Sequence, residues 1–424
     1  MTTVASELLT KAQAVREASR ELRRLSSSVK NGALLAIADA LERDQQVILD
    51  ANAQDMAAGQ TAGLSDAMLD RLLLNPERLN GMASDVRTIA ALPDPVGEEF
   101  DARTMDNGLR VAKRRVPLGV IGCIYESRPN VTTDITALCI KSGNTVLLRG
   151  GKEAVHSNQA LGELVRTALA SAGVTPEAVQ MVRSTDRELV QQMLKLNEYI
   201  DLLIPRGSAE LIRMVAQEAT MPAITGGIGV CHIYVDETAN VSKAVDIVFN
   251  SKVQRPTVCN ALDTVLVHVG VAPQFLPEMA SHLASAGVEL RCDGRALAIL
   301  GPSANDKVVQ AQESDWGQEF LSLVASVRVV DSMDEAIEHI ERFGSGHSEA
   351  ILTEDDSAAA RFLDDVEAAV VLVNASTRFN DGGQLGLGAE VAISTNKVHA
   401  RGPMGLRELT SYKWTVLGTG QVRP

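Results

Sequence analysis

The stretch GVIGCIYESRPNVTTDITALCIKSGNTVLLRGG, residues 119–151, places two apolar runs on either side of a helix-like segment. The runs GVIGCIY (119–125) and TVLLRGG (145–151) are short and continuous. Apolar strands of this kind, separated by helical segments, predict a parallel sheet that is covered by helices on both faces. The stretch therefore indicates an α/β fold, and in such folds ligands bind beyond the carboxyl ends of the strands.

The same alternation continues as far as residue 374, and a second series begins near residue 238. The further predicted strands share a short apolar run bounded by polar or turn residues: 178–184, 201–208, 230–236, 261–269, 296–300, 326–330, 348–353 and 368–374. Helical patterns at 334–343 and 356–367 separate the last three strands. Two such series predict two Rossmann-like domains, each built on a parallel sheet.

Residues 1–90 differ from both series, because they are helical in pattern and rich in Ala, Leu, Glu, Lys and Arg. Their apolar positions recur three and four residues apart, which is the spacing of an amphipathic helix. The segment NGALLAIADALERDQQVILDANAQD (31–55) is predicted as one such helix. We interpret these helices as scaffold, since an apolar stripe at this spacing is normally a core face.

Asn107 and Gly108 lie between two runs in which polar and apolar residues alternate. An Asn-Gly pair predicts a hairpin whose two turn residues both have positive φ. The tail at 405–420 has a strand pattern with no helix after it, and we expect it to pair with this hairpin. The predicted layout is two α/β domains (1–100 with 117–229, and 230–376) and a β-arm used in oligomerisation (101–116 and 405–420).

The chain of 424 residues carries a net charge of −14. Nucleic-acid-binding proteins need a basic surface, so this balance excludes that class while leaving room for a local basic pocket. No uncharged apolar run reaches the ~18 residues of a membrane helix, and the first 25 residues lack the apolar core of a signal peptide. We therefore expect a cytoplasmic protein that acts on a small molecule and has no membrane partner.

The five cysteines are widely spaced and form neither a CxxC pair nor a Cys/His ligand pattern. We therefore expect neither a disulfide framework nor a structural zinc site, and no metal is predicted. Cys123, Cys139 and Cys231 lie in or beside apolar runs, which favours buried packing roles. Cys292 is predicted to lie in a loop.

Cys259 lies in SKVQRPTVCNALDTVLVH (251–268), between a polar segment and an apolar run. A free cysteine is most often a small buried hydrophobe, and the pattern alone leaves that alternative open. The polar neighbours, including Lys252 and Arg255, favour a nucleophile, because nearby cations stabilise a thiolate. Cys259 is therefore the candidate nucleophile.

Two polar segments that follow predicted strands are candidate phosphate sites. Arg149 and Lys152 flank a Gly-Gly pair, where cations and a close backbone would suit a phosphate, although an exposed loop explains them equally well. Gly207 and Ser208 open a predicted helix, whose N-terminus can bind phosphate or simply be capped by the serine.

His347 and Glu349 lie where a helix ends and the strand at 348–353 begins, with Gly344 closing the helix. These two side chains either contact a substrate or only add polar groups to a strand edge. The pattern does not decide between the two alternatives.

These stretches, in this order, resemble the aldehyde dehydrogenase superfamily over nearly the whole chain. The likeness is strongest to a branch that reduces an acyl phosphate. Its most specific part is VDSMDEAIEHIERFGSGHSEAI (330–351), in which Phe343 stands where that branch is expected to have His or Tyr. RPNVT (128–132), SGNTVLLRGGKEA (142–154) and QRPTVCNALDT (254–264) are also typical of it. The resemblance implies that superfamily's fold, with two Rossmann-like domains, the first binding the cofactor and the second carrying the nucleophile.

The resemblance also implies roles for individual residues. Cys259 matches the catalytic cysteine, and Asn130 matches the side-chain donor to the oxyanion. Matches to cofactor contacts are Arg149 and Lys152 at the adenosine ribose, Gly207 and Ser208 at the pyrophosphate, and Glu319 at the nicotinamide ribose. Lys152 falls where NAD-preferring members have a glutamate, and a cation there suits the 2′-phosphate of NADP. The implied cofactor is therefore NADPH/NADP.

One departure from the superfamily pattern indicates the direction of the reaction. Members that oxidise aldehydes have a water-activating glutamate two residues before the Gly-Gly pair, and Ile224 occupies that position here. An enzyme that keeps its thioester for reduction gains nothing from such a base. The resemblance thus implies reduction of L-glutamyl 5-phosphate to the semialdehyde, in proline biosynthesis. Arg128 and Arg255 are expected to bind the acyl phosphate, and His347 and Glu349 to position the substrate.

Three alternative hypotheses are weighed against this one. A hydrolytic dehydrogenase would need the missing glutamate, a CoA-acylating one would need a CoA channel, and a non-catalytic scaffold would not need Cys259, Lys152 and Glu319. The expected partners are the small-molecule substrate, further copies of the chain in a dimer or tetramer, and transiently glutamate 5-kinase, which makes the labile acyl phosphate.

Overall fold

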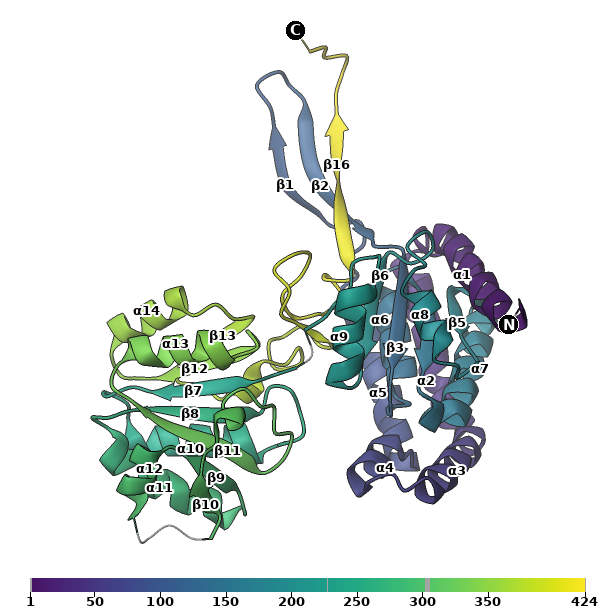
Figure 1. The fold of residues 1–424 in the computed structure, drawn as a ribbon. Coiled ribbons are helices and arrows are strands. Elements are labelled where there is room, and N and C mark those ends of the chain that lie inside the picture. Colours follow the sequence, from purple (N-terminus) through teal and green to yellow (C-terminus); the bar gives the residue numbers. More distant parts are fainter. Residues whose placement is uncertain (1, 227, 302–305, 424) are drawn as a thin grey trace. The chain divides into compact units, whose positions relative to one another are not determined.

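The computed structural model describes residues 2–226, 228–301 and 306–423, which divide into two compact units (Figure 1). Unit 1 comprises Met1–Thr225, Gly386–Ala392 and Met404–Pro424, and unit 2 comprises Gly226–Leu385 and Ile393–Pro403. Each unit has a parallel sheet of its own, and unit 1 also carries a three-stranded antiparallel sheet. The predicted α/β class, with two parallel sheets and a β-arm, is confirmed.

Unit 1 is built on a four-stranded parallel sheet with the order β5-β4-β3-β6. Its strands are β3 (Val120–Tyr125), β4 (Thr145–Gly150), β5 (Val179–Met181) and β6 (Leu202–Arg206). Helices lie on both faces of this sheet (Figure 1): α1 (Thr2–Leu22), α6 (Val131–Lys141), α7 (Val155–Ser171), α8 (Glu188–Met193) and α9 (Ala209–Glu218). Because all four strands run in one direction, the loops that follow them share one edge of the sheet.

Residues 2–91 of unit 1 are mainly helical, as predicted. After α1 they form α2 (Ser27–Arg43), α3 (Gln45–Thr61), α4 (Asp66–Leu72) and α5 (Pro76–Ala91). The prediction of one helix over residues 31–55 is wrong, because the chain leaves helical geometry at Asp44, where φ is −104° and ψ is 26°. The amphipathic pattern continues across this break, so periodicity alone does not reveal it.

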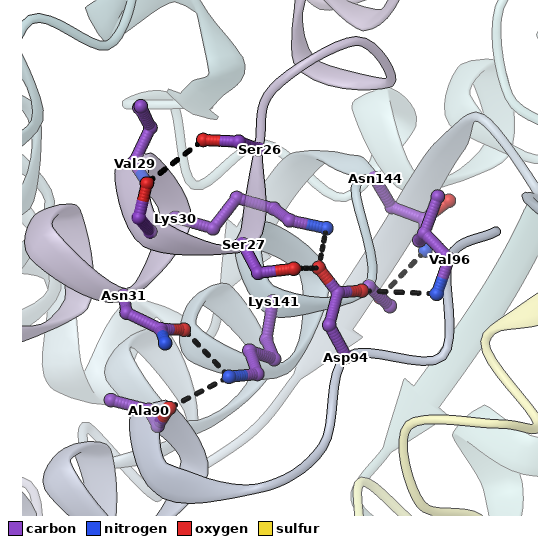
Figure 2. A network of polar contacts seen from close by, with 12 residues as sticks. Ser26, Ser27, Val29, Lys30, Asn31, Ala90, Asp94, Val96, Lys141 and Asn144 are labelled. Carbon is purple, nitrogen blue, oxygen red and sulfur yellow. Dashed lines mark hydrogen bonds and ion pairs between the residues drawn. The ribbon is translucent and has the colours of Figure 1, made fainter. Parts of the chain in front are cut away.

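A buried network of polar contacts links α2, α5 and α6 (Figure 2). Lys30 Nζ of α2 lies 2.5 Å from Asp94 Oδ2, just beyond α5, and the Lys30 side chain is 1% exposed. Lys141 Nζ, at the end of α6, donates to Asn31 Oδ1 at 2.6 Å and to the Ala90 carbonyl at 2.7 Å. Burial lowers the pKa of Lys141. Ammonium groups in such positions need close partners, because a buried unpaired charge is strongly destabilising.

The β-arm of unit 1 consists of β1 (Glu99–Thr104), β2 (Arg110–Pro117) and β16 (Thr410–Leu417), in the order β1-β2-β16 (Figure 1). The strands are antiparallel, and β16 pairs along its whole length with β2. The predicted hairpin and its pairing with the C-terminal tail are therefore confirmed.

The turn of the hairpin differs from the one predicted. Gly108 has a φ of +84°, but Asn107 does not have positive φ. The Gly108 N–H donates to the Met105 carbonyl at 2.8 Å, and the Met105 N–H donates to the Leu109 carbonyl at 2.8 Å. These bonds close a longer loop in which only the glycine is left-handed, as in hairpins built on a type I turn.

Unit 2 is built on a seven-stranded parallel sheet with the order β10-β9-β11-β8-β7-β12-β13. Its strands are β7 (Cys231–Val235), β8 (Leu262–His268), β9 (Glu289–Cys292), β10 (Val308–Gln310), β11 (Val324–Val330), β12 (Ser348–Leu352) and β13 (Val370–Val373). Its helices are α10 (Val241–Val253), α11 (Ala272–Ser285), α12 (Gly294–Leu300), α13 (Met333–Phe343) and α14 (Asp356–Asp365). A short antiparallel pair, β14 (Ile393–Ser394) with β15 (Gly402–Pro403), completes the unit.

Two buried apolar clusters hold the helices of unit 2 on its sheet. One joins α10, α11 and α12 to the central strands, through side chains such as Val248, Phe275 and Val265. The other joins α13 and α14 to β7 and β12, through side chains such as Tyr234 and Phe362. The central strands are thus covered by apolar side chains on both faces, which explains why they are continuous apolar runs in the sequence.

Two predictions for unit 2 are wrong. Residues 296–300 were expected to be a strand but belong to α12, because the Asp293 side chain caps the helix by accepting from the Ala296 N–H at 2.7 Å. Cys292, expected in a loop, is a buried residue of β9. An apolar run of only five residues fits a strand and one face of a short helix equally well, so the cap decides.

Across the described residues, none of the helices has both the length and the apolar character that crossing a membrane requires. In the same part of the chain, His, Cys, Asp and Glu side chains form no group of three that could hold a metal ion.

Candidate active site

Cys259 lies in the loop of residues 254–261, which joins the end of α10 to the start of β8 in unit 2. Cys259 is partly exposed, whereas the other four cysteines are buried. Burial raises the pKa of Cys123 and of Cys292 to about 12, and it raises the pKa of Cys139 and Cys231 well above the ordinary value. Thiols held protonated in this way are inert, so Cys259 remains the candidate nucleophile among the cysteines.

Only some of the polar residues expected around Cys259 lie at the surface. Gln254 and Arg255 are exposed, but Lys252 is buried. Lys252 Nζ donates to the Leu262 carbonyl at 2.7 Å and lies 3.7 Å from Asp263 Oδ1. Its ammonium therefore supports the base of the loop instead of lying on the surface beside the thiol.

Gly229 connects Cys259 to Glu319, the residue matched to the nicotinamide ribose contact. The Gly229 N–H donates to Glu319 Oε1 at 3.0 Å. On its other side, a Cβ placed on Gly229 would lie 1.6 Å from the Cys259 carbonyl oxygen. Only glycine permits this approach. Unit 2 thus brings the predicted nucleophile and the predicted cofactor-binding glutamate to one backbone position.

Asp263 is a second residue that holds this site together, and the sequence pattern did not point to it. Its Oδ1 accepts from the Phe320 N–H at 3.0 Å, and its Oδ2 accepts from the Cys231 N–H at 3.3 Å. Burial raises the pKa of Asp263 to about 6, against the opposing effect of the Lys252 ammonium. Since Phe320 directly follows Glu319, this carboxylate fixes the backbone that carries Glu319.

The segment of residues 376–380, which contains the short helix η5 (Thr377–Phe379), also packs on the Cys259 loop. Thr377 Oγ1 donates to the Asn260 carbonyl at 2.7 Å, and Asn260 Nδ2 donates to the Asn380 carbonyl at 2.9 Å. Arg378 donates from Nε to Gln254 Oε1 at 2.8 Å and from Nη1 to Asn260 Oδ1. None of the sequence patterns pointed to this segment, although a polar segment directly after a strand can indicate a binding loop.

His347 and Glu349 are both fully buried in unit 2. Glu349 Oε2 accepts from the His232 backbone N–H at 3.0 Å and lies 2.9 Å from His232 Nδ1. His347 Nδ1 lies 2.7 Å from Ser348 Oγ. Burial lowers the pKa of His347 to about 4 and raises the pKa of Glu349. Direct contact with a substrate would require these side chains to be uncovered.

The predicted cofactor contacts of unit 1 lie at the carboxyl edge of its sheet. Ser208 caps α9, since its Oγ accepts from the Leu211 N–H at 3.3 Å. The Ser208 N–H donates to Glu126 Oε2 at 2.8 Å, and a Cβ on Gly207 would lie 2.3 Å from the same oxygen. A carboxylate therefore occupies the N-terminus of α9, which is a position suited to anions.

Arg149 and Lys152 lie at the same edge but in different environments. Arg149 is 7% exposed and donates from Nη2 to the Thr185 carbonyl at 2.9 Å, while its buried Nε has no hydrogen-bond partner among the described residues. Lys152 is exposed at the start of the short helix η1 (Lys152–Ala154). A pocket beside them is lined by Gly150, Gly151, Val155, Asn158, Gln159, Met181, Val182, Arg183 and Thr185.

Asn130 and Arg128 follow β3 at this edge and are both partly exposed. Asn130 Nδ2 donates to Asp134 Oδ2 at 2.7 Å, within the first turn of α6. This bond uses one of the two N–H groups of the amide, so the other can donate to a second acceptor. The predicted site residues thus form two groups: Asn130, Arg128, Arg149, Lys152, Gly207 and Ser208 in unit 1, and Cys259, Arg255, Glu319, His347 and Glu349 in unit 2.

Comparison with known proteins gives one consistent result. Residues 4–314 match the aldehyde dehydrogenase family. The gamma-glutamyl phosphate reductase of Dehalococcoides mccartyi (strain CBDB1) is 56% identical over 417 residues, covering 98% of each chain. That of Roseiflexus castenholzii is 57% identical over 412 residues, covering 96% of this chain and 97% of its own.

Solved structures agree with the sequence comparison. The crystal structure of gamma-glutamyl phosphate reductase from Thermotoga maritima has a TM-score of 0.95 and 47% identity, covering 99% of this chain and 100% of its own. An acetylating aldehyde dehydrogenase from Geobacillus thermoglucosidasius has a TM-score of 0.70 at 18% identity, over 99% of this chain and 98% of its own. The latter likeness concerns the fold alone.

Proposed function

The chain belongs to the aldehyde dehydrogenase family, and from this premise we propose that it reduces L-glutamyl 5-phosphate to L-glutamate 5-semialdehyde and releases phosphate. This is a step of proline biosynthesis. The observation that carries the proposal is the identity of more than half of the residues with gamma-glutamyl phosphate reductases over nearly the full length. Cys259, which is partly exposed, supplies the nucleophile that this chemistry requires.

The first step is attack of the Cys259 thiolate on the γ-carbonyl carbon. The new S–C bond creates a tetrahedral oxyanion, and its collapse breaks the C–O bond to phosphate, which leaves with the electron pair. Backbone N–H groups beside Cys259 stabilise the oxyanion, together with the N–H of Asn130 that is not donated to Asp134. Loss of one such donor typically lowers kcat about 100- to 1,000-fold.

The second step reduces the thioester, for which the hydride comes from NADPH when that cofactor is bound. The thiolate of Cys259 then leaves, and the semialdehyde is released. Ile224, which stands where hydrolytic members have a glutamate, is buried and apolar, so it cannot activate water. This difference preserves the thioester for reduction.

The residues present at the edge of unit 1 fit a dinucleotide phosphate. The N-terminus of α9 already binds the Glu126 carboxylate through the Ser208 N–H, so a pyrophosphate oxygen can take that place. The exposed Lys152 would face a 2′-phosphate, and the unpartnered Nε of Arg149 would bond the adenosine ribose. In unit 2, Glu319 would hold the nicotinamide ribose.

The substrate contacts we propose are Arg128 and Arg255, because a guanidinium group matches an acyl phosphate in charge and geometry. His347 and Glu349 are proposed to position the substrate through the start of β12, which His347 precedes and Glu349 belongs to, since their own atoms are buried. The β-arm is proposed to join copies of the chain into a dimer or tetramer. Transient contact with glutamate 5-kinase would deliver the labile acyl phosphate.

The reverse reaction tests the proposed function. Glutamate 5-semialdehyde, supplied as its cyclised equilibrium mixture, is incubated with NADP and inorganic phosphate, and NADPH is followed by absorbance. We expect turnover that requires phosphate and is abolished in Cys259→Ala. Turnover without phosphate would indicate a hydrolytic dehydrogenase, a requirement for CoA would indicate an acylating one, and NADPH binding without turnover would indicate a scaffold.

A further inference from the structure

Arg378 is the cation that the structure places against the Cys259 loop and that none of the sequence patterns indicated. It lies in η5, and its half-buried guanidinium extends across the loop of residues 254–261. Nε donates to Gln254 Oε1 at 2.8 Å and Nη1 donates to Asn260 Oδ1, so the group is held at two points on either side of Cys259.

The protein offsets the charge of this guanidinium only in part, because Asp381 acts on it without forming an ion pair with it. Both acceptors are neutral amide oxygens, and in the described parts of the chain neither Arg378 nor Arg255 forms an ion pair with a carboxylate. The remaining nitrogen, Nη2, makes no hydrogen bond to the described residues. A partly buried cation that lacks a close ion pair is costly, and an anionic ligand offsets that cost.

The electrostatic surroundings of Arg378 include the catalytic thiol. Burial lowers the pKa of Arg378, and the neighbouring guanidinium of Arg255 lowers it further. The negative charges of Asp381 and of a Cys259 thiolate both raise it. Two guanidinium groups that repel each other beside a nucleophile form a site for a multiply charged oxyanion.

We propose that Arg378, together with Arg255, binds the phosphate of the acyl phosphate and stabilises it as the leaving group when Cys259 attacks. As the C–O bond breaks, negative charge moves onto the phosphate, and a guanidinium held in advance at that point stabilises the transition state. This inference rests on the proposed function, because it names the residues by which the site around Cys259 recognises an acyl phosphate.

The first test measures the site without any turnover. Cys259 is alkylated with iodoacetate, which is an anion, and with iodoacetamide, which is neutral and of similar size. Because the other four cysteines are buried, the labelling reports on Cys259. Both reagents attack the same thiolate, so a change in the fraction of thiolate or in the position of the loop alters both rates alike and leaves their ratio unchanged. We expect Arg378→Gln to lower this ratio about 10-fold and Arg378→Lys to restore most of it.

The second test uses the reverse reaction. For Arg378→Gln we expect the KM of inorganic phosphate to rise about 10- to 100-fold, as for loss of a charge-assisted hydrogen bond, with the KM of NADP unchanged. The matched control is Arg342→Gln, whose side chain is 70% exposed on α13 and lies 3.4 Å from Glu313. We expect that control to change neither the labelling ratio nor the KM of phosphate.

Two results would overturn the inference while leaving the proposed function intact. An unchanged labelling ratio in Arg378→Gln would mean that no anion site faces Cys259 at this point. Equal losses in iodoacetate labelling, iodoacetamide labelling and kcat, with the KM of phosphate unchanged, would mean that Arg378 only holds the loop. Failure of the proposed function is a different observation, namely wild-type turnover that does not require phosphate.

Discussion

The backbone of Gly229 packs directly against the carbonyl group of Cys259, with no room for a side chain between them. The same residue donates its N–H to Glu319, so any displacement of Gly229 moves both the proposed nucleophile and the proposed cofactor contact of unit 2. Close approach of two backbones is the reason that glycine is required at this position, since Gly229 does not have positive φ.

Gly229→Ala is therefore expected to reduce activity far more than stability. The methyl group would push the Cys259 carbonyl away, and a misplacement of about 1 Å at a reacting group can cost about 100-fold in rate. The measurements are kcat in the phosphate-dependent reverse reaction and the rate of Cys259 alkylation. Gly81→Ala, in an exposed turn of α5 with nothing near the added Cβ, is the control and should stabilise by about 0.5–1 kcal/mol. Wild-type kcat in Gly229→Ala would contradict this prediction.

The stability of the protein should fall between pH 7.5 and pH 5 because of His347. Its pKa is about 4 in the folded chain and about 6.5 when unfolded, so the unfolded chain binds more protons in this range. The stabilisation is complete above pH 6.5 and is lost as the pH falls towards 4, by about 2 kcal/mol at pH 5. Urea denaturation at the two pH values measures this change.

His347→Gln should remove that part of the pH dependence, whereas His156→Gln, at an exposed histidine of α7, should leave it unchanged. The raised pKa of Glu349 acts in the opposite direction in all three proteins and therefore cancels in the comparison. An identical pH dependence in wild type and His347→Gln would refute the assignment.

Lys152→Glu should change the choice of cofactor. The new carboxylate would repel a 2′-phosphate and accept hydrogen bonds from a free ribose diol. We expect the KM of NADPH to rise about 10- to 100-fold while that of NADH rises little or falls. The control is Lys243→Glu, whose side chain is 65% exposed on α10. Equal increases for both cofactors would mean that Lys152 contributes only general attraction.

Lys30→Met should destabilise unit 1 by about 3–5 kcal/mol, because it leaves the Asp94 carboxylate buried without its cation. The double variant Lys30→Met with Asp94→Asn should recover much of that loss. Chemical denaturation followed by circular dichroism measures both. Arg43→Met breaks an exposed ion pair with Asp44 and should cost less than 1 kcal/mol. A small effect of Lys30→Met would mean that Asp94 is satisfied by Ser27 and Val96 alone.

Much of the fold was predictable because most strands of both parallel sheets are continuous apolar runs bounded by turns. The errors have local causes. The helix ends at Asp44 although the amphipathic pattern continues past it. Residues 296–300 are helical because the side chain of Asp293 caps them. Neither event changes hydrophobic periodicity, which was the signal used.

The candidate site was predictable in part, for a related reason. Cys259 stood out because its flanking residues are polar and its position precedes an apolar strand. Gly229, Asp263 and Arg378 act through contacts with residues distant in sequence, the last across more than a hundred positions to Asn260. A local pattern contains no trace of such contacts, so only the folded chain reveals these residues.

The β-arm has a consequence for synthesis of the protein. Its central strand, β2, is paired on one side by β1, which is next to it in sequence, but on the other side by β16, about 300 residues later. At a translation rate of about 5–20 residues per second, the open edge of β2 waits on the order of 15–60 s for its partner. Unpaired edges invite pairing with other chains, and the basic side chains of β2 (Arg110, Lys113, Arg114 and Arg115) are the kind of charge that discourages it. The edge of β2 in the nascent chain therefore stays open to aggregation until β16 has left the ribosome.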